Sequence, residues 1–352
     1  VSKEEAAKRI ADGEEHVIRL KLPKDKDIKC HDIVRGNITI NSDDIDDQVL
    51  LKSDGYPTYH MAVVVDDYLM KITHIVRGEE WLASTPKHVY LYEVFGWEPP
   101  IYVHLPTVLN KERKKLSKRH GDVSVDDFRE KGYLPEGLIN YLALVGWSPE
   151  DNEEIFSMEE LIQQFTFERV SKAGGIFDKD KLDWVNGHYI RNASVEEITD
   201  MAIPYLKEAE LIDDEFVKTN YEWLKILIDS VKESLSTVQE SVDKVEFIFQ
   251  NKVDIVEEDA LETLKTEGLP DILSAIKEEL DDKESISMDY AKGFMKIIQK
   301  KSGVKGKNLF MPTRAVLTGS VHGPDLVSIL YLLGKENILK RIEYVENQYL
   351  NI

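Results

Sequence analysis

The sequence predicts an α/β part followed by an all-α part. Between residues 84 and 109 a helix precedes a short apolar run, and β-branched and aromatic residues come before both. This order of strand, helix and strand is typical of a parallel sheet. From about residue 195 to 352, nearly every segment carries apolar residues at helical spacing. A chain of 352 residues with 42% hydrophobic content is long enough for two to four domains.

Composition excludes several classes of protein. The formal net charge is −21, which argues against indiscriminate nucleic-acid binding, because that affinity comes from Lys and Arg on phosphates. A local basic cluster can still bind a polyanion. No apolar run approaches the roughly 20 residues that a bilayer span needs, and the single cysteine, Cys30, cannot form an intramolecular disulfide. We therefore expect a cytoplasmic protein with no membrane partner.

Local signals place the elements of the α/β part. The helix near residue 90 has Pro86 in its first turn and Gly96 as its stop. The region before it is rich in Val, Ile, Thr and Tyr, which predicts strands around a turn. The expected elements are a charged helix at 1–16, strands within 17–22, 31–40 and 47–82, a helix at 84–97 and a buried strand at 101–109.

The second half of the chain is predicted to be helical. Three tryptophans, Trp147, Trp184 and Trp223, fall on apolar helical faces and are expected in the core. The expected helices cover residues 134–147, 157–165, 177–190, 196–211, 221–249, 259–267, 270–280 and 288–301.

A basic stretch interrupts this acidic chain. KERKKLSKRHG, residues 111–121, holds six Lys or Arg side chains, and turn-forming residues on both sides predict a loop. Lys115 and Lys118 flank Ser117, so two ammonium groups and a hydroxyl can converge on phosphate oxygens and neutralise the charge of a leaving pyrophosphate. The spacing leaves open a solvated basic patch, or a nucleic-acid contact without chemistry.

The K-L-S-K-R run in this stretch resembles the second signature of class I aminoacyl-tRNA synthetases. Further segments resemble bacterial-type glutamyl-tRNA synthetase in order and spacing, from about residue 30 to the last helix. These segments are DGYPTYHMAVVVDDYLMKITHIVRGEEWLASTPKHVYLYEVFGW, HLPTVLNKERKKLSKRHGDVSV, REKGYLPEGLINYLALVGWSP, FDKDKLDWVNGHYIR, GKNLFMPTRAVLTGSVHGPDL and LLGKENILKRI.

The resemblance implies a partial Rossmann-like catalytic domain, a stem-contact region and helical anticodon-binding lobes. The family's P-x-P-T-G-x-x-H-x-G motif, which packs on the adenine and ribose of ATP, does not occur in these 352 residues. We therefore expect a fragment without the N-terminal half of the nucleotide-binding domain. The implied domains are 1–59, the tail of the acceptor-stem insertion; 60–112, the second half of the Rossmann-like domain; 113–194, the phosphate loop and stem-contact domain; and 195–352, the anticodon-binding region.

The resemblance also implies which residues bind glutamate. Arg77 matches the arginine that binds the side-chain carboxylate, for which a guanidinium fork is suited. Tyr59 matches a tyrosine whose hydroxyl reaches the same carboxylate. Val63 stands where the family usually has asparagine, which removes a polar contact. The alternatives are a strand-end Arg77 paired with Glu79 or Glu80, and a half-buried strand aromatic at Tyr59.

ATP is expected to lie between two groups of residues. Glu80 and Trp81 match the pair that borders the ribose and base. Lys115, Ser117 and Lys118 match the catalytic phosphate loop, and the two lysines also bind ATP. No protein ligand for a metal is implied, because Mg²⁺ is shared among the phosphates.

The expected contacts with tRNA lie in two regions. Arg119 and His120 add charge that serves either ATP or tRNA. Arg314 matches an arginine that faces the anticodon bases, which are splayed and single-stranded. A plain helix-surface arginine is the alternative for Arg314.

The family chemistry is that of a glutamate–tRNA ligase, which joins glutamate to ATP and then to the 3′ end of tRNA(Glu). A monomer is expected. The chain by itself is expected to bind tRNA weakly without making glutamyl adenylate. A non-catalytic tRNA-binding or scaffold protein derived from a synthetase is the alternative. Glutaminyl-tRNA synthetase is disfavoured because it ends in β-barrels, whereas the end of this chain has helical periodicity. A synthetase-like enzyme that glutamylates a modified base is disfavoured because it lacks anticodon lobes.

Overall fold

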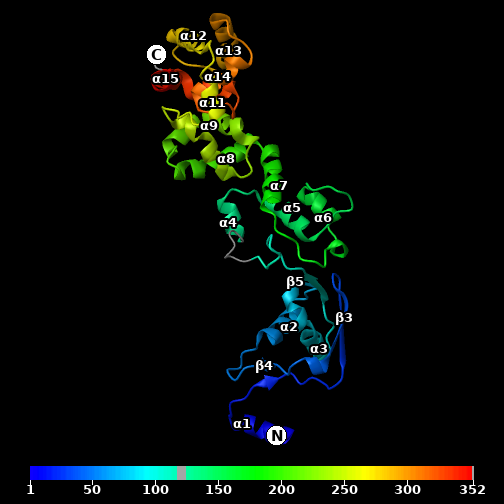
Figure 1. Ribbon diagram of the computed structural model, residues 1–352. Coiled ribbons are helices and arrows are strands. Elements are labelled where there is room, and N and C mark those ends of the chain that lie inside the picture. The colour runs from blue at the N-terminus through cyan, green and yellow to red at the C-terminus, as the bar shows by residue number, and fades with distance from the viewer. Residues whose placement is uncertain (117–123, 351–352) are drawn as a thin grey trace. The chain divides into compact units, whose positions relative to one another are not determined.

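The computed structural model describes residues 1–116 and 124–350 (Figure 1). The chain divides into two compact units, one of residues 1–121 and 139–178 and the other of residues 122–138 and 179–352. One of the three divisions along the chain falls inside helix α5, Pro135–Gly146. The domain boundaries predicted after residues 59, 112 and 194 stay predictions.

The first unit contains a four-stranded sheet in the order β3-β2-β6-β5. Strands β2 and β3 are antiparallel, whereas β6 is parallel to both β2 and β5. The predicted order of strand, helix and strand is confirmed by β5, α3 and β6. The bounds are β2 Asp27–Asp32, β3 Gly36–Asn41, β5 His74–Gly78, α3 Thr85–Phe95 and β6 Ile101–Leu105.

Two small cores hold this unit together. In the first, α2 and α3 pack with β2 through Ile28, Val64, Leu91 and Tyr92. In the second, Val103 of β6 packs with residues of the segment that includes α6. The other elements of the unit are α1 Lys3–Ala11, β1 Ile18–Arg19, which pairs with β4 Val49–Leu51, α2 Tyr59–Leu69 and α6 Met158–Gln164.

Helix α2 corrects the prediction of strands throughout residues 47–82. Its sequence contains three consecutive valines, and β-branched residues favour strands. The segment is nevertheless a helix that starts after Thr58, whose backbone is extended. Val64 is only 1% exposed in the core with α3, so tertiary packing overrides local propensity.

The second unit is helical, as its periodicity predicted. Most of its buried hydrophobic residues form one core, and helix starts carry capping residues such as Ser194, whose hydroxyl and Glu197 complete a capping box. In the described part of the chain, no helix has the length and apolar run needed to span a membrane. The helices are α4 Val125–Glu130, α7 Lys179–Asn192, α8 Val195–Glu208, α9 Asp214–Lys232, α10 Ser241–Phe249, α11 Glu258–Thr263, α12 Leu269–Asp281, α13 Met288–Ser302, α14 Lys307–Thr318 and α15 Leu326–Val345.

The expected burial of the three tryptophans is right for two of them. Trp147 is buried, and Trp223 packs against the helical core. Trp184 of α7 is exposed, and the Lys181 ammonium lies 4.5 Å from the centre of its ring. The attraction between a cation and an indole face compensates part of the cost of exposing this ring. The apolar spacing of α7 did not reveal that Trp184 would be exposed.

A buried arginine holds helix ends together in the second unit. Arg341 of α15 is fully buried, and its guanidinium donates to the carbonyls of Leu317, Phe247 and Gln250. These carbonyls lie at the C-terminal ends of α14 and α10. Such ends leave carbonyls without helical partners and attract positive charge. Burial lowers the pKa of Arg341 to about 10.

We expect Arg341→Met to lower the free energy of unfolding of the helical unit by about 3 kcal/mol, because it leaves buried carbonyls without donors. Urea unfolding measures this change. Lys340→Met, at the exposed neighbouring position, is the control and should change stability by less than about 0.5 kcal/mol. Equal effects of the two substitutions would show that Arg341 does not hold these helix ends.

Candidate active site

Arg77 lies near the C-terminal end of β5, directly across from His104 of β6 in the parallel register. Its Nε donates to His104 Nε2 at 3.0 Å, and its Nη2 donates to Thr85 Oγ1 at 3.0 Å. His88 Nδ1 lies 3.5 Å from Nη1. These partners of Arg77 differ from those in the alternative prediction, in which Arg77 pairs with Glu79 or Glu80.

Aromatic rings surround this guanidinium. Arg77 Cζ lies 6.0 Å from the centre of the Trp81 ring and 5.7 Å from that of Tyr102. Tyr59, the first residue of α2, has its ring centre 4.8 Å from that of Trp81. The structure therefore brings together Arg77, Tyr59 and Trp81, three of the residues predicted for the site. Because Tyr59 opens a helix and is exposed, it is not a half-buried strand aromatic.

Asp32 and His104 lie beneath Arg77 and were not singled out from the sequence. Asp32 Oδ2 accepts from both the backbone N and Nδ1 of His104, at 2.9 and 2.6 Å. The two side chains are at most 1% exposed. Burial lowers the pKa of His104, although the hydrogen bond from His104 to Asp32 opposes this effect. Their strands lie far apart in sequence, so only the parallel pairing of β2 with β6 could have indicated the contact.

Two further histidines lie on the helices, one beside Arg77 and the other beside the first. His88 of α3 is buried, and burial together with the charge of Arg77 lowers its pKa to about 3. Its Nε2 lies 2.8 Å from Nδ1 of His60 in α2, and burial also lowers the pKa of His60. Both imidazoles are therefore neutral near pH 7, and Arg77 supplies the positive charge here.

Glu79 braces the site instead of pairing with Arg77. Its carboxylate accepts from the backbone N of Thr107 at 2.9 Å and from Arg35 Nη2 at 2.7 Å. Arg35 also donates to the carbonyls of Lys172 and His104. The hydrogen bond from Thr107 is the main cause that lowers the pKa of Glu79. This network connects the ends of β2, β5 and β6.

The described part of the basic loop begins at a tight turn. The backbone N of Asn110 donates to the carbonyl of Lys114, and its side chain accepts from the N of Lys114, both at 2.8 Å. Arg113 in this turn has a φ of 59°. The backbone of Lys115 then pairs with that of Leu109 in an isolated antiparallel β-bridge. Ser117, Lys118, Arg119 and His120 lie outside the described residues.

Lys115 and Glu80, two residues predicted to contact ATP, lie next to each other. The ammonium of Lys115 is 3.6 Å from Glu80 Oε1, and both side chains are at least half exposed. The Glu80 carboxylate folds back over Gly78, where a Cβ atom would lie 2.2 Å from Oε2. A side chain at Gly78 would therefore push Glu80 away from Lys115.

A second close approach fixes the base of the loop. Leu109 donates to the carbonyl of Gly175, and Phe177 donates to the carbonyl of Leu109, both at 2.8 Å. A Cβ atom on Gly175 would lie 1.9 Å from the carbonyl of Val145. Only glycine lets the backbone at 175 approach Val145 so closely, and the two hydrogen bonds of Leu109 connect the start of the basic loop to this segment.

Arg314, the predicted anticodon contact, lies on α14 in the helical unit. It is half-buried and donates to the carbonyl of Pro324, and burial lowers its pKa. Because Nη1 already has this partner, Arg314 is more than a plain helix-surface arginine. Arg314 belongs to the second unit, whereas Tyr59, Arg77, Glu80, Trp81 and Lys115 belong to the first.

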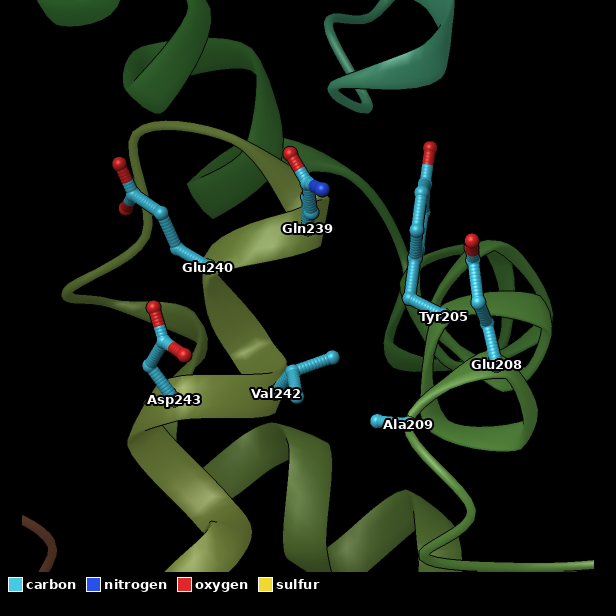
Figure 2. A pocket seen from close by; sticks show the side chains of 7 residues that line it. All are labelled: Tyr205, Glu208, Ala209, Gln239, Glu240, Val242 and Asp243. Atoms are coloured by element: carbon cyan, nitrogen blue, oxygen red, sulfur yellow. The ribbon is translucent and has the colours of Figure 1, made fainter.

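A separate cavity of about 380 Å³ opens on the helical unit (Figure 2). Three carboxylates lie around it, on Glu208, Glu240 and Asp243. Within the residues that the structure describes, no cluster of three or more His, Cys, Asp or Glu side chains is arranged to hold a metal ion. The acidic lining is unsuited to phosphate groups.

Comparison with known proteins agrees with this architecture. Residues 1–184 match the family described as class I tRNA synthetases (E and Q), catalytic domain. Residues 197–345 match the family described as anticodon binding domain. A sheet unit with a basic loop and a helical unit thus correspond to the two functional parts of a class I aminoacyl-tRNA synthetase.

Individual relatives narrow this class. The chain is 54% identical over 350 residues to a glutamate–tRNA ligase of Clostridioides difficile, covering 99% of this chain and 71% of the relative. It is 56% identical over 344 residues to that of Alkaliphilus metalliredigens, covering 98% and 70%. The crystal structure of a glutamate tRNA ligase from Elizabethkingia meningosepticum in complex with its amino acid superposes with a TM-score of 0.83 at 33% identity, covering 99% of this chain and 72% of that one.

The chain belongs to the glutamate–tRNA ligase family. The resemblance predicted from the sequence is confirmed, as is the α/β part followed by an all-α part. The chain spans about 70% of the length of these relatives.

The buried histidine His88 predicts a pH dependence of stability. Its pKa is lowered in the folded state, so below pH 6.5 the unfolded chain binds a proton that the folded chain does not. The contribution of His88 to stability is therefore fully present above pH 6.5. As the pH falls from 6.5 to about 3, this contribution decreases by about 1.4 kcal/mol per pH unit.

The measurement is amide hydrogen exchange of β5 and β6 at pH 7 and pH 5, with His88→Gln as the comparison. We expect the drop in opening free energy between these pH values to be about 2 kcal/mol smaller in the variant. An equal drop in both proteins would contradict a neutral buried His88.

Proposed function

We propose that this chain supplies the glutamate pocket and the pyrophosphate side of the active site of a glutamate–tRNA ligase. A glutamate α-carboxylate oxygen attacks the α-phosphorus of ATP, and pyrophosphate leaves. A terminal ribose hydroxyl of tRNA then attacks the mixed anhydride, and AMP leaves. The observation that carries the proposal is the convergence of Arg77, Tyr59 and Trp81 at the C-terminal end of β5, where ligands of parallel sheets bind.

Arg77 and Tyr59 receive the side chain of glutamate. A guanidinium with neutral histidines around it pairs with a carboxylate, whereas the amide of glutamine would leave its charge uncompensated. Val63, at the usual asparagine position, packs against the core of α2 and α3. Recognition of the side chain therefore rests on Arg77 and Tyr59 with one polar contact fewer.

ATP lies between Trp81 and the basic loop. Glu80 and Trp81 border the ribose and base, while Lys115 and Lys118 neutralise the pyrophosphate and the hydroxyl of Ser117 donates a hydrogen bond to it. Mg²⁺ would enter with ATP and be shared among its phosphates. Phosphate oxygens would compete with Glu80 for the Lys115 ammonium, which lies 3.6 Å from Glu80 Oε1.

The helical unit binds tRNA(Glu). Its match to an anticodon binding domain supports this role, and we place Arg314 against the anticodon and Arg119 against tRNA nearer the active site. The protein acts as a monomer in the cytoplasm.

Arg77 tests the glutamate pocket. In the full product of the gene, Arg77→Met should raise the KM for glutamate by about 100-fold, because a charge-assisted bidentate contact is lost. The KM for ATP should change by less than about threefold. ATP–pyrophosphate exchange in the presence of tRNA(Glu) measures both constants, and Arg9→Met, at an exposed arginine of α1, is the control. An unchanged KM for glutamate would show that Arg77 does not bind the side chain of glutamate.

The 352-residue chain alone tests the division of the active site. It carries no P-x-P-T-G-x-x-H-x-G motif, so we expect tRNA(Glu) to bind while ATP–pyrophosphate exchange stays at background. Gel-shift and exchange assays measure the two properties. Exchange by this chain at the rate of an intact relative would contradict the proposal, whereas absent exchange in the full product of the gene would favour a non-catalytic tRNA-binding or scaffold protein.

A further inference from the structure

We propose that Asp32 and His104 form a buried hydrogen-bond chain that fixes Arg77 in the orientation that receives a carboxylate. His104 is then a positioning residue for amino-acid selection, although it does not touch the substrate. The inference rests on the proposed role of Arg77 in binding glutamate.

The first step is the geometry of the guanidinium. Nε and Nη2 share one edge of this planar group, and Nη1 and Nη2 share the other. His104 Nε2 and Thr85 Oγ1 accept from the first edge, both at 3.0 Å, and these two acceptors lie 3.2 Å apart. The protein thus binds Arg77 along one edge in the way a carboxylate would. On the second edge, Nη1 also has His88 Nδ1 at 3.5 Å. That distance is at the long limit for a hydrogen bond, so the edge can still receive the two oxygens of a ligand.

The second step is the tautomer of His104. Asp32 is anchored by the backbone N of Val34 and Arg35, which donate to Oδ1 at 3.0 and 2.8 Å. Its Oδ2 accepts from the backbone N and Nδ1 of His104. With a carboxylate at Nδ1, the imidazole proton lies on Nδ1, and Nε2 presents a lone pair to Arg77.

Burial keeps this arrangement in one state. Asp32 and His104 are at most 1% exposed, so water does not compete for their hydrogen bonds. The lowered pKa of His104 favours the neutral ring, and a protonated ring would turn an N–H toward Arg77 Nε. The hydroxyl proton of Thr85 can go to the carbonyl of Trp81 or to His104 Nε2, each 3.2 Å away, and in both cases its oxygen can accept from Arg77.

The consequence is selectivity. A guanidinium already held along one edge loses little rotamer entropy when a carboxylate binds the other. An amide presents one acceptor and one NH₂ group, and the NH₂ would face an N–H of Arg77 without a partner. If His104 no longer held Arg77, the side chain would reorient, and both affinity and discrimination would fall.

The experiment compares His104→Leu with His104→Gln in the full product of the gene. Leu removes the acceptor, whereas the side-chain carbonyl of Gln can replace Nε2. We expect His104→Leu to raise the KM for glutamate on the order of tenfold or more, with the KM for ATP within about twofold. His104→Gln should recover most of this loss. His74→Gln, at an exposed histidine of β5, is the matched control and should leave both constants unchanged.

Asp32→Asn provides a second variant. An amide NH₂ facing Nδ1 favours the tautomer with the proton on Nε2, which opposes Arg77, so the KM for glutamate should rise at least as far as in His104→Leu. Thermal unfolding identifies any variant that fails to fold. If His104→Leu does not fold, the KM values for glutamate of His104→Gln and Asp32→Asn decide whether the inference holds.

Three outcomes have distinct meanings. A rise in glutamate KM for His104→Leu with recovery in His104→Gln supports the inference. If His104→Leu folds and leaves the KM for glutamate unchanged, while Arg77→Met still raises it, the inference is overturned. The inference is also overturned if the KM for ATP rises in parallel with the KM for glutamate. Unchanged glutamate KM in Arg77→Met as well overturns the proposed function itself.

Discussion

The site depends on one partly buried contact, the hydrogen bond from Arg77 Nε to His104 Nε2. A cation at the end of a parallel strand is costly unless its N–H groups have partners. Here those partners are neutral, so they satisfy the guanidinium without cancelling its charge. The positive charge is thereby reserved for an anionic substrate. The parallel register that places Arg77 across from His104 is what makes this arrangement possible.

The rest of the first unit supports that register. Asp32 joins β2 to β6, and Arg35 and Glu79 connect the strand ends to the segment around Lys172. Where two backbones or a backbone and a carboxylate come close, the chain has glycine, as at Gly78 and Gly175. The basic loop therefore starts at a fixed place, with Lys115 beside Glu80.

The sequence predicted those parts of the fold that local chemistry determines. Pro86 and Gly96 marked the ends of α3 correctly, since each acts through its own backbone. Helix α2 was missed because its valines favour strands, while its burial depends on α3 and β2. Trp184 was misplaced because helical spacing does not show which face stays uncovered.

The candidate site divides in the same way. Arg77, Tyr59, Trp81 and Lys115 were predicted as site residues through the family resemblance of the short segments that contain them. Asp32 and His104 were not predicted, because their contact arises only when strands from distant parts of the chain pair. Such supporting residues carry no local signature, and a single sequence gives no register between β2 and β6.

A crystal structure of the full product of the gene with bound glutamate tests this account most directly. We predict that the two oxygens of the side-chain carboxylate lie within hydrogen-bonding distance of Nη1 and Nη2 of Arg77, while Nε remains on His104. A carboxylate bound elsewhere, or an Arg77 turned away from His104 to reach it, would contradict the account.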